Sequence, residues 1–149
     1  MQAREIMTED PVCCSTNDSI RTVAKEMLEN SCGFVPVVDN AQNKQLVGVI
    51  TDRDIVCRIL AKDGADYSNA TVQNAMTTGH LWTVRANASV DDVIEAMEEG
   101  QVRRIPVVDD GNKIIGVIST ADVALEVDDT DDIAEVFEEI SEPTHIPHA

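Results

Sequence analysis

Apolar residues alternate between a helical period and strand-like runs along the chain, and the order of these patterns occurs twice. In the first copy, apolar positions three and four apart predict an amphipathic helix over 19–29. Two β-rich runs over 34–38 and 46–51 follow it, and a further helical pattern begins after Thr51. These patterns predict a helix, two strands and a second helix.

A shorter lead-in segment precedes these elements in each copy. Residues 3–7 read as a short helix, which ends at the turn-forming residues 9–11, and 12–14 read as a strand. The counterparts are 72–76 and 81–84. Each half is therefore predicted to run helix, strand, helix, strand, strand, helix. This is an α+β fold with one small sheet in each half.

The second copy repeats the first with a nearly constant offset. Pro36 and Pro106 are 70 residues apart (106 − 36), and Gly48 and Gly116 are 68 apart (116 − 48). A unit of about sixty residues buries little core by itself, so we expect two pseudo-symmetric halves to pack into one module. The predicted parts are a first repeat over 1–66, a second repeat over 67–126 and an acidic C-terminal segment over 127–149.

The C-terminal segment carries a helical pattern of its own. Ile133, Val136, Phe137 and Ile140 predict one more amphipathic helix, which ends before Pro143. Its apolar stripe needs a covering surface, and the body of the protein and a second subunit are equally open choices. The tail after it is expected to be frayed.

Composition and charge restrict the class of protein. The 149 residues are 43% hydrophobic, which is typical of a globular chain, and no stretch resembles a signal peptide or a membrane span. We therefore expect a soluble, cytoplasmic protein. The formal net charge of −17 argues against nucleic acid or a membrane as the partner.

The cysteines and histidines give no metal signature. Cys13, Cys14, Cys32 and Cys57 lack a CxxC spacing. A zinc site would need a histidine to converge on one of these cysteines, and no spacing indicates that. We predict reduced thiols and no metal.

The candidate chemistry lies where the second β-rich run of each copy ends. Thr51 and Asp54 recur as Ser119 and Asp122, a hydroxyl residue followed three positions later by an acid. The structural interpretation is a capping box, which satisfies amides at a helix start. The functional interpretation is a nucleotide site, because helix amides favour a phosphate and a carboxylate accepts hydrogen bonds from a ribose diol. Glycines within both runs, Gly48 and Gly116, also indicate that something approaches the backbone closely.

The two copies together resemble a known family. An apolar-Pro-Val-Val-Asp run followed by Gly-x-x-Thr/Ser-x-x-Asp, present twice in register over residues 3 to about 125, is similar to the cystathionine β-synthase (CBS) domain pair, or Bateman module. The resemblance implies two α+β halves with two clefts between them. Ligands of such modules are usually adenosine-based: AMP, ADP, ATP, NAD or S-adenosylmethionine.

The resemblance also implies roles for particular residues. Asp54 and Asp122 are expected to accept the ribose diol, with Thr51 and Ser119 near ribose or phosphate. The pocket lining implied by the family pattern is Val35, Pro36, Val49, Ile105, Pro106 and Val117.

Cationic residues distinguish the two copies. Arg103 and Arg104 stand where such modules often contact phosphate, whereas the first copy has Gly33 and Phe34 there. The first copy would need Arg53 or a residue from the other half for this purpose. We therefore expect inequivalent sites and favour the one with Asp122.

The leading hypothesis is a regulatory sensor that binds an adenosine-containing ligand and transmits its presence to a partner. Adenine nucleotide is expected as a regulatory ligand and no cofactor as obligatory. A different class of function is a ligand-free interaction or scaffold protein, acting through dimerisation and the acidic C-terminal helix. An enzyme is not expected, because no P-loop, GxSxG or HExxH motif is present. The family resemblance further implies a homodimer.

Overall fold

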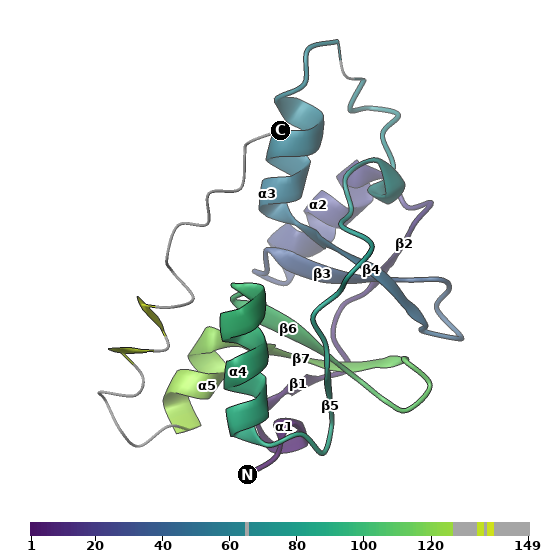
Figure 1. Cartoon of the computed structure of the whole chain (residues 1–149). Coiled ribbons are helices and arrows are strands. Elements are labelled where there is room, and N and C mark those ends of the chain that lie inside the picture. The colour runs from purple at the N-terminus through teal and green to yellow at the C-terminus, as the bar shows by residue number, and fades with distance from the viewer. Residues whose placement is uncertain (65, 127–133, 136, 139–149) are drawn as a thin grey trace. The chain divides into compact units, whose positions relative to one another are not determined.

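The computed structural model of the chain describes residues 1–64, 66–126, 134, 135, 137 and 138 (Figure 1). The elements, in chain order, are α1 (Ala3–Ile6), β1 (Thr8–Glu9), β2 (Cys14–Ser15), α2 (Ile20–Glu29), β3 (Phe34–Val38), β4 (Leu46–Thr51), α3 (Asp52–Ile55), the π-helix η1 (Val56–Leu60), the 3-10 helix η2 (Val72–Asn74), β5 (Val84–Arg85), α4 (Val90–Gly100), β6 (Arg104–Val108), β7 (Ile114–Ser119) and α5 (Thr120–Glu126). The predicted α+β class is confirmed. The helix predicted around Ile133 to Ile140 falls largely outside the described residues.

The chain forms two compact units whose limits differ from those of the sequence repeats. One consists of 10–81 and 108–115, and the other of 1–9, 82–107 and 116–149. The N-terminal lead-in therefore belongs with most of the second repeat, and the 72–77 lead-in belongs with the first. We refer to them as the first-repeat unit and the second-repeat unit.

The first-repeat unit contains a three-stranded sheet in the order β2-β3-β4. β2 pairs parallel with β3, and β3 pairs antiparallel with β4. Helices α2 and α3 lie on one side of this sheet (Figure 1). Ser19 caps α2, the helix predicted over 19–29, by accepting a hydrogen bond from the Thr22 amide. Buried apolar side chains form the core of this unit, and they include Ile20, Val23, Met27, Val35, Val37, Ile50, Ile55 and Ile59.

The second-repeat unit holds a four-stranded sheet in the order β1-β7-β6-β5. Helix α4 begins at a capping box formed by Ser89 and Asp92 and runs alongside this sheet (Figure 1). β1 is an addition to the prediction, because residues 9–11 read only as a turn. It pairs antiparallel with β7, with Thr8 opposite Val117. Buried side chains on the facing elements make its core: Val93, Met97, Ile105, Val107, Ile118 and Val123.

The lead-in segments explain two glycines that the sequence alone assigned to a ligand. A Cβ on Gly48 would lie 2.8 Å from the Thr77 carbonyl oxygen, and a Cβ on Gly116 would lie 2.5 Å from Met7 Sδ. The chain itself makes the close approach at both glycines. A glycine in each strand is therefore required by packing of a lead-in segment, whether or not a ligand binds.

Candidate functional site

Two carboxylates, Asp54 and Asp122, sit at corresponding points just after β4 and β7. In the first-repeat unit, Asp54 Oδ2 accepts the Thr51 amide at 3.0 Å, and the Asp54 amide donates to Thr51 Oγ1 at 3.1 Å. In the second-repeat unit, Asp122 Oδ2 accepts the Ser119 amide at 2.8 Å and the Ser119 hydroxyl at 2.9 Å. Both acids are partly buried. The capping interactions that the spacing predicted are therefore formed in both units.

These capping bonds leave the carboxylates able to accept more. A carboxylate has about four lone-pair positions, and the capping bonds occupy one or two of them. Each acid is thereby fixed in orientation by its own backbone while it keeps acceptor capacity. That is the requirement for a group that receives two hydroxyl hydrogen bonds from a diol.

The helix after Thr51 differs from the prediction. It begins as the single α-turn α3 and continues as the π-helix η1, in which the Ala61 amide donates to the Val56 carbonyl at 2.9 Å. π-turns are rare and often mark functional segments. So short an α-segment has little macrodipole, and the site depends on its side chains rather than on a long helix axis.

The backbone brings Arg103 to the second-repeat site. The Thr120 amide donates to the Arg103 carbonyl at 2.9 Å, which holds Arg103 beside the Ser119 turn. Arg103 and Arg104 are both exposed at the start of β6. Two exposed arginines therefore belong to the unit that contains Asp122, and the backbone of one of them adjoins the Ser119 turn.

The first repeat has Gly33 and Phe34 at the positions of these arginines, and an acid lies against Gly33. The Asp52 amide donates to the Gly33 carbonyl at 3.0 Å, and a Cβ on Gly33 would lie 2.7 Å from Asp52 Oδ2. The Asp52 carboxylate thus occupies the space through which a side chain at position 33 would leave the backbone. An arginine there would need Asp52 to move, so the missing cation and the added acid are linked.

The remaining residues of the predicted pocket divide by burial. Val49 and Val117 are half-buried, on the strands that lead to Thr51 and Ser119. The others lie in the cores of their own units: Val35, Pro36, Ile105 and Pro106. Their contact with a ligand stays a prediction.

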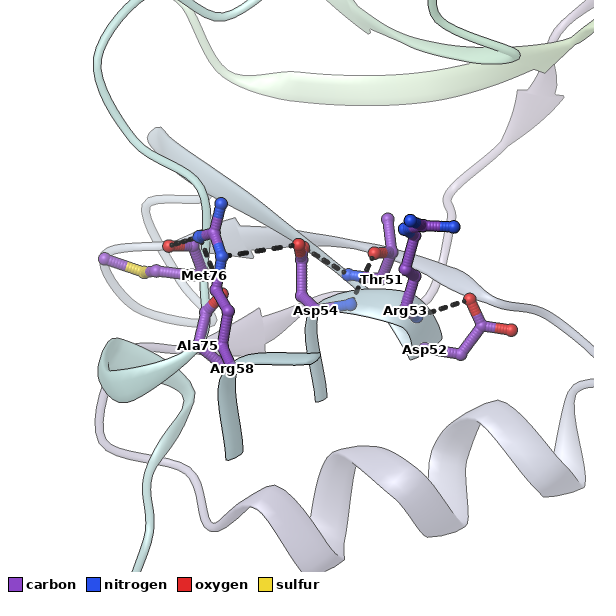
Figure 2. A network of polar contacts seen from close by, with 7 residues as sticks. All are labelled: Thr51, Asp52, Arg53, Asp54, Arg58, Ala75 and Met76. Carbon is purple, nitrogen blue, oxygen red and sulfur yellow. Dashed lines mark hydrogen bonds and ion pairs between the residues drawn. The ribbon is translucent and has the colours of Figure 1, made fainter. Parts of the chain in front are cut away.

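One charged residue of the site was missed by the sequence interpretation. Arg58 Nε lies 3.8 Å from Asp54 Oδ1, and its Nη1 donates to two backbone carbonyls, those of Ala75 at 3.1 Å and Met76 at 3.0 Å (Figure 2). The available signal was its position four residues after Asp54 on a predicted helix, the spacing at which an acid and a base meet.

No metal centre accompanies these residues in the part of the chain that the structure describes. There, no three His, Cys, Asp or Glu side chains are grouped so as to hold a metal ion. Among the same residues, no helix is long and apolar enough to cross a membrane.

The structure thus contains two α+β repeats, each with a strand that ends in a hydroxyl residue and has a carboxylate three positions on. The family model described as the CBS domain matches residues 3–61 and 72–129. The chain belongs to the CBS domain family.

Relatives and solved structures agree with this assignment. Hypoxic response protein 1 of Mycobacterium tuberculosis is 34% identical over 122 residues, which are 82% of each chain. Its crystal structure, described as having two coordinated zinc ions, has a TM-score of 0.75 at 33% identity and covers 85% of this chain and 99% of that one. The uncharacterized protein YlbB of Bacillus subtilis is 33% identical over 139 residues, 93% of this chain and 90% of the relative.

A further structure was solved with ligands. The CBS domain pair of protein MJ0100, in complex with 5′-methylthioadenosine and S-adenosyl-L-methionine, has a TM-score of 0.72 at 26% identity. The match covers 84% of this chain and 94% of that one.

Proposed function

We propose that this protein is a regulatory module that binds an adenosine-containing ligand through Asp54 and Asp122 and reports its presence to a protein partner. The observation that carries the proposal is the pair of carboxylates, each oriented by a backbone amide and each retaining acceptor capacity for a ribose diol. The MJ0100 domain pair, a relative by fold and sequence, was solved with two adenosine compounds.

The second-repeat site is the better candidate for a ligand with phosphates. Arg103, whose carbonyl accepts the Thr120 amide, and Arg104, which follows it, are exposed cations of the same unit. The first-repeat site has Asp52 in the corresponding region, which would repel a phosphate. We therefore expect a nucleotide such as AMP or ATP at Asp122 and a ligand with less negative charge at Asp54.

A thermal-shift titration tests the proposal. AMP, ATP, NAD, S-adenosylmethionine and 5′-methylthioadenosine would each be added to the wild type and to Asp122→Asn and Asp54→Asn, with Asp91→Asn on α4 as a matched control. A ligand at 100 times its dissociation constant adds about 2.7 kcal/mol to the free energy of unfolding, or about 5–10 °C in Tm. A shift that one of the site variants loses and the control keeps supports the proposal. No shift with any compound contradicts it and favours the scaffold function.

Self-association is the second part of the proposal. Several apolar side chains on the helices are exposed: Leu28 at 80%, Val56 at 52%, Leu60 at 54% and Leu125 at 83%. Their neighbours Ile55, Ile59 and Val123 are buried in the cores. The apolar residues of these helices thus comprise buried ones that pack in the cores and exposed ones that a second subunit would cover. Sedimentation of Leu60→Glu and Leu125→Glu, compared with the wild type, measures whether these positions hold a homodimer.

We propose a regulatory rather than a catalytic role, because the site holds fixed hydrogen-bonding groups. The hydroxyl of Ser119 does donate to Asp122, but the same carboxylate oxygen also accepts the Ser119 amide, as in a helix cap. Incubation of the pure protein with ATP should leave the nucleotide intact, and steady turnover that Asp122→Asn abolishes would contradict the regulatory role.

A further inference from the structure

Arg58 joins the first-repeat site to the chain that leads into the second repeat. Its Nη1 donates to the carbonyl oxygens of Ala75 and Met76, and its Nε faces Asp54 Oδ1 at 3.8 Å. Figure 2 shows the guanidinium between the two carbonyls and the carboxylate. A single planar group therefore contacts both the proposed diol acceptor and a segment 17 or 18 residues further along the chain.

The same segment is bonded to the strand that carries the site. The Val49 amide donates to the Thr77 carbonyl at 3.1 Å, and the Thr77 amide donates to the Val49 carbonyl at 2.8 Å. Val49 lies two residues before Thr51 on β4. The segment 75–77, which we call the linker clamp, is thus held at one side by Arg58 and at the other by β4.

The geometry suits a positioning role better than a stabilising one. The Arg58 side chain is 45% exposed and the Asp54 side chain 16% exposed, and so open an ion pair contributes little to stability. The ion pair instead fixes the orientation of the Arg58 side chain, because a guanidinium offers its donors in a rigid planar fork. Two carbonyls hold one end of the fork, so the charge on Asp54 determines how firmly the other end is held.

The second repeat has a different residue at the position of Arg58. The residue four positions after Asp122 is Glu126, at the place that Arg58 takes after Asp54. An acid there cannot donate to backbone carbonyls or pair with a carboxylate. Of these two corresponding residues, Arg58 can make such contacts and Glu126 cannot.

We propose that Arg58 is a positioning residue that couples the state of Asp54 to the linker clamp. The proposal rests on the proposed function, because a ribose diol is what would change the state of Asp54. The diol hydroxyls donate to the carboxylate and compete with Arg58 Nε for Oδ1. Ligand binding then loosens Arg58 and, through it, the hydrogen bonds between Thr77 and Val49.

A double-mutant cycle without ligand tests the coupling. Amide hydrogen exchange at Thr77 would be measured by NMR in the wild type, Asp54→Asn, Arg58→Gln and the double variant. We expect Asp54→Asn to speed Thr77 exchange about two- to fivefold in the wild-type background and to have no further effect once Arg58 is replaced. Additive effects of the two substitutions overturn the inference.

Two further variants separate coupling from a general loss of structure. Arg58→Lys keeps the positive charge, so it should retain part of the response to Asp54→Asn even where Arg58→Gln disturbs η1. Glu126→Gln at the corresponding place in the second repeat should leave Thr77 exchange unchanged. A change of Thr77 exchange in Glu126→Gln equal to that in Arg58→Gln overturns the inference.

A second arm uses 5′-methylthioadenosine as the probe. In the wild type its binding should speed Thr77 exchange to a similar extent as Asp54→Asn, and in Arg58→Gln it should bind without this effect. Binding seen at the Thr51 amide with no change at Thr77 in the wild type overturns the inference. Absence of binding by any adenosine compound overturns the proposed function instead, and the ligand-free cycle still decides whether Arg58 couples Asp54 to the linker clamp.

Discussion

The carbonyl oxygen of Thr77 lies 2.8 Å from the point that a Cβ on Gly48 would occupy. Because that oxygen is backbone and accepts the Val49 amide, it cannot move without breaking a hydrogen bond. We expect Gly48→Ala to lower the free energy of unfolding by about 1–3 kcal/mol. Urea denaturation of the ligand-free variant measures this.

The matched comparison is Gly116→Ala, where the nearest atom is Sδ of Met7 at 2.5 Å from the added Cβ. The methionine side chain is flexible and can turn away. The loss should therefore be smaller than for Gly48→Ala, although the distance from the added Cβ to its nearest atom is shorter. If Gly116→Ala lost more stability than Gly48→Ala, the linker clamp would be shown to move more easily than Met7.

Loss of the Thr51 hydroxyl should destabilise the protein even without a ligand. Thr51 Oγ1 accepts the Asp54 amide at 3.1 Å in the capping box. We expect Thr51→Ala to cost about 1 kcal/mol of stability and Thr51→Ser, which keeps the hydroxyl, to cost less. Thermal unfolding of both variants in the absence of nucleotide measures the effect. If Thr51→Ala were as stable as the wild type, the hydroxyl would contribute nothing to stability and could act only on a ligand.

The stability of the protein should depend on pH through the carboxyl group of Glu26. Burial, followed by the charges of Asp18 and Glu29, raises the pKa of its carboxyl, and its Oε2 is buried without a hydrogen-bond partner. The folded state then holds the proton more tightly than the unfolded state. Stability contributed by this group is present below the unfolded pKa and is lost as pH rises through the folded pKa.

Glu26→Gln removes this titration. The variant should melt about 1–3 °C above the wild type at pH 7, and the difference should disappear as the pH falls below about 4.5. Melting curves across this range measure it, with Glu95→Gln, an exposed acid on α4, as the control. A gain that persists unchanged at low pH would assign the effect to packing rather than to the charge.

The cysteines should differ in reactivity. Burial raises the pKa of the Cys13 thiol to about 11 and that of Cys14 to about 12, whereas Cys57 is exposed on η1. At pH 8 about 0.1% of Cys13 and 0.01% of Cys14 would be thiolate, the reactive form. Iodoacetamide should therefore label Cys57 at least tenfold faster than the adjacent pair, as peptide mass spectrometry would show. Cys57→Ser should remove the fast phase, and the unfolded protein should lose the difference.

The sequence predicted the fold class and most elements, because their signals are local. Ser19 and Ser89 mark the starts of α2 and α4, and the runs at 34–38 and 46–51 became β3 and β4. The spacing of Thr51 and Asp54 likewise predicted a capping box, which is present. Helical period, caps and alternating burial depend on neighbours within a few residues.

What the sequence left out depends on partners far along the chain. The strand β1 forms because Thr8 pairs with Val117, and a strand of two residues has no local sequence pattern that would predict it. The sequence correctly predicted that other atoms lie close to Gly48 and Gly116, but it did not show that the lead-in segments supply those atoms. The spacing of Arg58 from Asp54 could have indicated their ion pair, but its bonds to the carbonyls of Ala75 and Met76 carry no residue-type signal.

The exchange of lead-in segments between repeats has a consequence for how the chain folds during synthesis. Thr8 and its strand partner Val117 are 109 residues apart (117 − 8), so β1 has no partner until nearly the whole second repeat has left the ribosome. Val49 must likewise wait for Thr77. Non-local contacts of this kind slow folding. A first repeat that ended at residue 61 would lack Thr77, the partner of Val49 on β4, and we expect chaperones to bind such a fragment.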